Sequence, residues 1–259
     1  MPEDAGMEYV EVEAARDMAG LRLVLTAGVP GPWGEAAKGI FHVKRLGFVG
    51  VRQVAAGPNT ALREWTCQTS APVAVWNDER PRTTWLDQLF LAERLAPEPA
   101  LIPADPRDRA RMFGLAHEIC GEEGLGWCRR LMMLDHTFHE AAPPEAQKRA
   151  ARAIAAKYGY NEAAAAAAPG RVAQVLGLLA VQLAEQQGRG REFLIGDRLS
   201  ALDIYWATFA AMVAPLPAAL CPMPEPLRER YTLDPAPDST LLAHRDRIYR
   251  DILPTPLDF

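Results

Sequence analysis

The first third of the chain alternates short apolar runs with amphipathic stretches. The run at 21–26, bounded by glycines and prolines, is typical of a buried strand. The same reasoning predicts two further strands and two helices, at 49–54, 72–76, 34–46 and 83–95. Residues 58–66 fit an irregular or helical connection. Alternation of strands and helices over roughly 80 residues predicts a small α/β layer structure.

The pattern changes after residue 96. Prolines at 97, 99, 103 and 106 indicate a linker at 97–106 and a domain boundary. Beyond it, strand patterns disappear and helices are predicted at 107–134, 144–157, 169–187 and 200–213. The six alanines at 163–168 are good helix formers but otherwise uninformative.

Five segments follow from this pattern. We expect a polar lead-in at 1–20, an α/β domain at 21–96, the linker, an all-helical domain at 107–215 and a C-terminal extension at 216–259. The extension is proline-rich, with one helical patch at 241–252, and we expect it to wrap the surface. The predicted fold class is therefore α/β plus all-α.

A capping box marks the start of the helix at 200–213. Ser200 is placed as the N-cap, and Asp203, three residues on, can return a hydrogen bond to the N-cap backbone N–H. The residues from Ile204 onward are mostly apolar, so we expect a buried helix. Taken alone, the box is structural and performs no chemistry.

Composition narrows the function classes. The formal net charge is -5 over 259 residues, which argues against a nucleic-acid partner, because phosphate binding needs clustered Lys and Arg. Met1 to Asp17 is acidic, so no signal peptide is expected, and no run was identified that approaches the ~20 apolar residues of a membrane span. The four cysteines form no C-x-x-C pair, which favours reduced thiols in a cytoplasmic protein.

Two polar groups invite a functional interpretation. Asp135, His136, His139 and Glu140 have the spacing of one helix face, but a clear third metal ligand is lacking, so no metal is predicted. The Arg129-Arg130 pair is interpreted as solvated surface rather than an anion site.

The segment Leu194-Ile-Gly-Asp-x-x-Ser200-x-x-Asp203-Ile resembles the buried N-capping box in the C-terminal domain of glutathione transferases. A small α/β domain, a proline linker and a helical domain with this box follow the order of the cytosolic members of that family. The resemblance implies a thioredoxin-like N-terminal domain and an all-helical C-terminal domain. It also implies glutathione as co-substrate, an electrophilic small molecule as substrate, and a homodimer.

The family opens its third strand with a cis-proline, and Ala71-Pro72 stands at that place. The resemblance assigns the backbone of Ala71 to the cysteine part of glutathione; a plain trans proline at a strand start is the alternative. Eleven residues on, Thr83-Thr84 stands where the family binds the γ-glutamyl end. Ordinary N-capping of the helix explains these threonines equally well.

The family's catalytic Tyr, Ser or Cys falls at Trp33, which offers only an indole N–H. Thr26 carries the nearest hydroxyl but lies several residues early. Backbone N–H groups near Gly34, at the start of the helix, could instead lower a thiol pKa. Alternatively, Trp33 is a loop aromatic that packs on the domain interface.

A stripe of residues just after the linker has helical spacing. In the family this helix lines the pocket for the electrophile, although such stripes more often belong to a buried core; the residues are Met112, Phe113, Ala116 and His117. Two functions remain open: an enzyme that conjugates or cleaves an electrophile with glutathione, and a non-catalytic binding or scaffold protein that has kept the fold.

Overall fold

The computed structural model describes residues 7–140 and 145–259. The first six residues of the lead-in, and Pro144 at the start of a predicted helix, lie outside the described residues. The chain divides into two compact units. An α/β unit comprises Met1–Leu101, Leu216–Pro224 and Arg247–Phe259, and a helical unit comprises Ile102–Pro215 and Glu225–Asp246.

The α/β unit is built on a three-stranded sheet in the order β2-β1-β3. The central strand β1 (Leu21–Thr26) pairs in parallel with β2 (Val49–Gln53) and antiparallel with β3 (Val73–Trp76). Val24 stands opposite Val51 on one side and Val73 on the other. Nearly every residue of β1 is buried, which explains why the sequence shows a continuous apolar run there.

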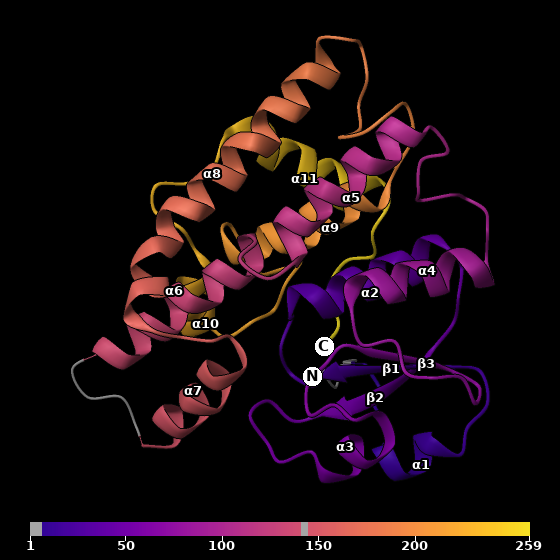
Figure 1. The fold of residues 1–259 in the computed structure, drawn as a ribbon, viewed down its shortest axis with the longest axis vertical. Coiled ribbons are helices and arrows are strands. Elements are labelled where there is room, and N and C mark those ends of the chain that lie inside the picture. Colours follow the sequence, from indigo (N-terminus) through magenta and orange to yellow (C-terminus); the bar gives the residue numbers. More distant parts are fainter. Residues whose placement is uncertain (1–6, 141–144) are drawn as a thin grey trace. The chain divides into compact units, whose positions relative to one another are not determined.

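Helices cover both faces of this sheet. Helices α2 (Pro32–Val43) and α4 (Trp85–Leu95) lie together on one face, and α1 (Val12–Arg16) and α3 (Thr60–Thr66) lie on the opposite face (Figure 1). Helix α2 begins with Pro32 at its first position, where the missing N–H does no harm.

The lead-in is more structured than its polar composition indicates. Val12 and Ala15 of α1 are buried against the sheet core, and Val10 forms an isolated parallel bridge with Val51 of β2. Val12 and Ala15 are enough to pack α1 on the sheet, although the helix is too short to show a clear hydrophobic period in the sequence.

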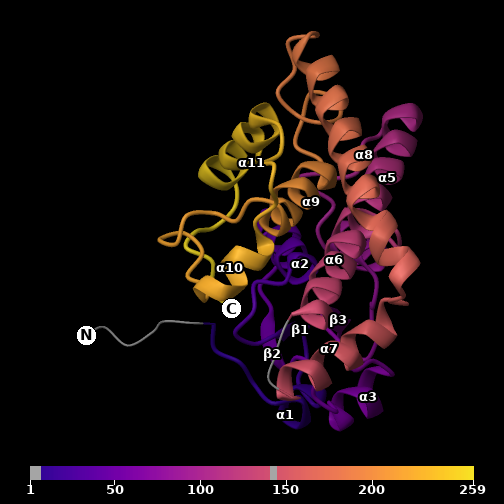
Figure 2. The same ribbon diagram turned by 90° about the vertical axis from the view of Figure 1, so that its left-hand side faces the viewer.

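The helical unit contains most of the helices in the second part of the chain. They are α5 (Pro106–Cys120), α6 (Leu125–His139), α7 (Glu145–Lys157), α8 (Glu162–Gln187), α9 (Ala201–Phe209) with the short 3-10 helix η1 (Ala210–Met212), and α10 (Glu225–Tyr231). Helix α6 packs on α8, and α5 packs on α9 (Figure 2). Helix α9 is buried throughout, as its apolar sequence predicts.

The single helix predicted at 107–134 is wrong: α5 and α6 are separate helices. Gly121 leaves the helix with an extended backbone, and Gly124 precedes the first residue of α6. A Cβ at Gly124 would lie 2.6 Å from the carbonyl oxygen of Glu118, so only glycine allows this tight connection. Periodicity alone did not reveal the break because the apolar positions of both helices continue through it.

Helix α8 begins earlier than predicted. Asn161 caps it, accepting a hydrogen bond from the Ala164 N–H at 2.9 Å, and the alanine run forms its first turns. Pro169, which was expected at the start of a helix, lies inside it. The proline was therefore misread as a first-turn residue.

Helix α8 is also long and apolar enough to cross a membrane by length and composition, contrary to the sequence-based expectation that no segment is. This is weak evidence for a membrane span, since core helices of soluble proteins pass the same test. Its alanines raise the mean hydropathy, while Val172, Val175 and Leu179 are buried inside the protein.

The C-terminal extension is divided between the two units. Helix α10, which the sequence did not predict, belongs to the helical unit, and α11 (Ser239–Asp251) corresponds to the helical patch predicted at 241–252. The last residues belong to the α/β unit, where the Leu257 N–H donates to the Leu220 carbonyl oxygen at 2.8 Å.

Candidate functional site

The first turn of α2 carries the residues aligned with the family's catalytic position. Trp33 and Gly34 are the second and third residues of the helix, and both are half-buried. The N-cap, Gly31, has no side chain that could accept a hydrogen bond from the backbone N–H groups of this turn. A Cβ at Gly34 would lie 3.1 Å from Leu25, because α2 lies close to the sheet here.

The nearest hydroxyl to this turn has another partner. Thr26 ends β1, and its Oγ1 donates to Gln53 Oε1 at 2.6 Å. Gln53 is buried and its Nε2 donates to the carbonyl oxygens of Val54 and Thr69 at 2.7 and 3.1 Å. Thr26 therefore belongs to a structural network that joins the ends of β1 and β2.

Pro72 directly precedes β3, and the Ala71-Pro72 peptide bond is cis. The carbonyl oxygen of Pro72 accepts a hydrogen bond from Gln88 Nε2 at 3.1 Å. The same amide group donates to the carbonyl oxygen of Arg82 at 3.2 Å, and Arg82 bridges to Ala74 of β3. Sequence reasoning missed Gln88, a buried residue of α4 that fixes the backbone on both sides of β3.

Thr84 is the N-cap of α4, with its hydroxyl oxygen accepting from the Asp87 N–H at 3.0 Å. The hydroxyl also donates to the Asp87 carboxylate at 3.0 Å, and Arg80 pairs with that carboxylate at 3.2 Å. Thr83 is exposed and lies outside the helix. Thr84 therefore caps α4, and its hydroxyl already contacts the Asp87 carboxylate.

A polar cluster that the sequence did not reveal lies against α2. Lys38 Nζ pairs with the buried Glu35 at 2.9 Å and donates to the backbone carbonyl of Asp258, near the C-terminus, at 2.5 Å. Burial raises the pKa of Glu35 to about 7, although Lys38 acts in the opposite direction. The only available sequence signal was Glu35 and Lys38 three residues apart on one helix.

Tyr9 belongs to the same cluster. Burial raises the pKa of its hydroxyl to about 12, and the carboxylates of Glu35 and Asp258 add to the effect. Among the described residues its buried Oη has no hydrogen-bond partner. Arg52 lies over the Tyr9 ring, 5.4 Å from the centroid.

The residues predicted to line an electrophile pocket are all in α5, but they differ in exposure. Met112 and Ala116 are fully buried in the core of the helical unit, Phe113 is half-buried and His117 is exposed. Arg109 lies over the Phe113 ring at 5.1 Å from its centroid. Within this unit, Met112 and Ala116 act as core residues.

The capping box is present and forms part of a larger buried network. Asp203 Oδ2 accepts from the backbone N–H and the hydroxyl of Ser200, each at 2.9 Å. Asp203 Oδ1 accepts from the Leu194 N–H at 2.8 Å and lies 3.0 Å from His244 Nε2. His244 lies in α11, so the sequence motif could not reveal it.

The Asp135 to Glu140 segment ends α6 without forming a metal cluster. No group of three metal-ligating side chains was found among the residues that the structure describes. The Asp135 carboxylate instead accepts from the Tyr160 hydroxyl at 2.8 Å, and His139 Nδ1 lies 2.9 Å from the Asp135 carbonyl oxygen.

The sequence matches no protein-family model and no curated protein. Solved structures nevertheless share its fold. A glutathione S-transferase of Methylobacterium radiotolerans, in complex with glutathione sulfonate, is 19% identical; the match covers 91% of this chain and 93% of that one, with a TM-score of 0.59.

Two further structures match equally well. Rice GST1 in complex with glutathione is 19% identical, with 93% of each chain covered and a TM-score of 0.60. The beta-etherase LigF of Sphingobium sp. is 20% identical, with 90% of this chain and 96% of that one covered and a TM-score of 0.60. At these identities the likeness establishes the fold: the chain has the glutathione S-transferase fold, a thioredoxin-like N-terminal domain followed by an all-helical domain.

Proposed function

We propose that the protein is a divergent member of the glutathione transferase superfamily that binds glutathione and joins it to, or uses it to cleave, an electrophilic small molecule. The observation that carries the proposal is a shared fold over about nine tenths of the chain with proteins that hold glutathione or its sulfonate. We also propose a soluble, cytoplasmic homodimer, and the formal net charge of -5 argues against a nucleic-acid partner.

In this proposal the α/β unit binds glutathione through backbone groups. The backbone of Ala71, before β3, would pair with the cysteine part of glutathione, as in other proteins with this fold. The start of α4, at Thr83 and Thr84, would hold the γ-glutamyl carboxylate through the Thr84 hydroxyl and the positive end of the helix dipole.

Thiol activation would come from the first turn of α2. Residues 27–43 contain no Ser, Thr, Tyr or Cys, so no side chain there can donate a hydroxyl or thiol hydrogen to a thiolate. Backbone N–H groups near Gly34, at a helix start whose N-cap supplies no side-chain hydrogen bond, would stabilise the thiolate charge together with the positive end of the helix dipole. Because one donor in such a site is worth roughly a hundredfold in rate, we expect weak turnover.

Calorimetric titration with glutathione tests binding, and the conjugation rate with 1-chloro-2,4-dinitrobenzene tests turnover. Thr84→Val removes the hydroxyl but not the helix N–H groups, and Thr69→Val serves as the control outside α4. We expect weaker glutathione binding by Thr84→Val alone. Failure of the wild-type protein to bind glutathione would contradict the proposal.

The second candidate function is a non-catalytic binding or scaffold protein, and the absence of a side-chain hydroxyl or thiol in residues 27–43 favours it. Glutathione binding without any conjugation or ether-cleaving activity would select this candidate. Light scattering at micromolar concentration tests the homodimer, which a monomer mass would contradict.

A further inference from the structure

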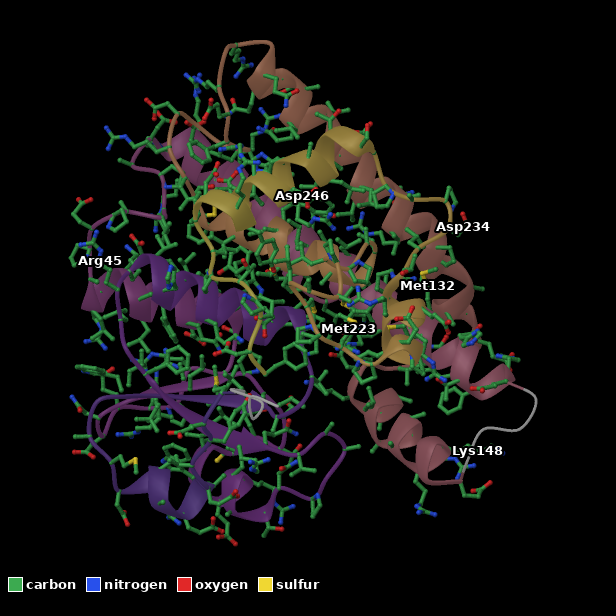
Figure 3. All side chains as sticks on the ribbon, turned by 180° about the vertical axis from the view of Figure 1, so that it is seen from behind. Arg45, Met132, Lys148, Met223, Asp234 and Asp246 are labelled. Carbon is green, nitrogen blue, oxygen red and sulfur yellow. The ribbon has the colours of Figure 1, made fainter. Side chains whose placement is uncertain are left out.

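A pocket of about 610 Å³ lies within the helical unit, between α6 and α10. One face of α6 lines it, with residues at helical spacing from Arg129 to Glu140, and the other wall comes from α10 and the residues that follow it. Met132, at the centre of the α6 face, lies beside the ribbon of α10 in Figure 3. The volume is in the range of small-molecule sites, ~300–1,000 Å³.

The buried end of the pocket is positively charged. Arg129 is almost fully buried, and its guanidinium donates to the backbone carbonyls of Met212, Arg230 and Tyr231 at 2.7, 3.1 and 3.3 Å. Its remaining nitrogen, Nη1, has only the weak sulfur acceptor of Met132, 3.6 Å away. Two of these carbonyls end α10, so Arg129 also holds that helix against α6.

No carboxylate neutralises this charge. Within residues 7–140 and 145–259, neither Arg129 nor the adjacent Arg130 forms an ion pair with Asp or Glu; Arg130 donates to the Tyr231 hydroxyl at 3.2 Å. Burial, together with the charge of Arg130, lowers the pKa of Arg129 to about 10. A buried cation compensated only by neutral groups gains stability from a nearby anion. The interpretation of Arg129-Arg130 as solvated surface is therefore wrong for Arg129.

The rest of the pocket suits an apolar body. Met132 and Met133 are half-buried on the α6 side, and Leu233 is half-buried on the opposite wall. Methionine side chains adapt to ligands of varied shape. Two carboxylates, those of Glu140 and Glu229, also line the pocket. Both residues are exposed, and Glu140 pairs with Arg230 at 3.2 Å, so an incoming anion competes with acidic groups at the exposed end rather than at the buried end.

We propose that this pocket binds a small organic anion, with its carboxylate or sulfonate group toward Arg129 and its apolar body on the methionines of α6. All of the lining residues belong to the helical unit, whereas the residues of the proposed glutathione site belong to the α/β unit. It assigns a binding role to α10, which the sequence did not predict.

The test is calorimetric titration of the full-length protein with 2-naphthoate and with its uncharged analogue 2-naphthalenemethanol. We expect the carboxylate to bind at least about tenfold more tightly than the alcohol, because only the carboxylate pairs with Arg129. No heat of binding up to about 1 mM naphthoate, or equal affinities for the two compounds, would overturn the proposal. Displacement by saturating glutathione would place the naphthoate in the other site and also overturn it.

Two pairs of variants locate the binding. Met133→Glu adds a like charge inside the pocket and should weaken naphthoate binding at least about tenfold. Leu178→Glu makes the same kind of change at an exposed position of α8 outside the pocket and should leave the affinity unchanged. Unchanged affinity in a folded Met133→Glu protein, checked by circular dichroism, counts against the pocket.

The second pair tests for a gain in affinity, so it remains informative if Met133→Glu does not fold. Glu140→Gln removes the rim carboxylate that pairs with Arg230 and should tighten naphthoate binding about threefold. Glu225→Gln removes an exposed carboxylate from α10 that does not line the pocket. Equal affinities in these two variants would contradict the assigned site.

Discussion

Each unit buries a carboxylate in the first turn of a helix, but the two carboxylates differ in how many polar partners surround them. In the helical unit, Asp203 has four polar partners: two groups of Ser200, the Leu194 N–H and His244. In the α/β unit, Glu35 has one close cation, Lys38, and burial raises its pKa to about 7. Depth of burial is therefore a poor guide to how a carboxylate contributes to stability.

The difference lies in where the partners come from. Three of the groups around Asp203 are on its own or a neighbouring segment of chain, so they are in place as soon as the helix start forms. The environment of Glu35 depends on Tyr9 and Asp258, from the two ends of the chain. We infer that Asp203 stabilises the fold, whereas Glu35 makes its stability depend on pH.

Replacing the better-satisfied carboxylate should have the largest effect. Asp203→Ala leaves the N–H groups of Ser200 and Leu194 and the ring of His244 without their acceptor, at a cost of about 3–5 kcal/mol. We expect the melting temperature to fall by roughly 10 °C or more. Differential scanning calorimetry measures the melting temperature, with the exposed Asp197→Ala as control. Equal melting temperatures for Asp203→Ala and the wild type would show that the capping box does not stabilise the fold.

Glu35→Gln should change how the free energy of unfolding depends on pH, more than its maximum value. Because folding raises the pKa of Glu35 from 4.5 to about 7, its contribution is present below pH 4.5 and lost as pH rises through 7. In the wild type this loss is worth up to about 3 kcal/mol. The difference in unfolding free energy between pH 5 and pH 8, measured with urea, should be smaller for Glu35→Gln than for the wild type. The exposed Glu13→Gln should show the wild-type difference. Equal pH slopes in all three proteins would contradict the assignment.

Trp33→Ser tests the first turn of α2 as a reaction site. A hydroxyl added at this helix start should raise the conjugation rate at saturating glutathione about tenfold, equivalent to ~1.4 kcal/mol. Thr26→Val, which disturbs only the bond to Gln53, should leave the rate unchanged. Wild-type turnover near ~10 per second that is lost in Thr26→Val but not in Trp33→Ser would show that Thr26 is the catalytic residue.

Asp258→Ala should have the smallest effect. Its carboxylate is half-exposed and lies 3.2 Å from Lys38 Nζ, whose stronger contact is with the backbone carbonyl of the same residue. We expect less than about 1 kcal/mol of destabilisation in urea unfolding. Since the Asp258 charge raises the pKa of Glu35, its removal should move the pH midpoint of stability downward. An unchanged midpoint would show that the Asp258 charge does not affect Glu35.

The sequence by itself determined most local elements. The three strands, the helix starts near Pro32 and Trp85 and the capping box at Ser200 all follow from apolar runs, turn residues and capping patterns that act within a few residues. The break at Gly121 to Gly124 and the early start of α8 did not follow, because glycine and proline each permit more than one local structure.

Only the tertiary structure decided which groups meet. His244 beside Asp203, the carbonyls of α10 around Arg129 and Asp258 against Lys38 each join residues more than thirty positions apart. Such contacts leave no periodic signal, since one residue at each end is enough to make them. Local interactions act along the chain and can be inferred from it, whereas buried polar partners are chosen by packing, which no short stretch of sequence records.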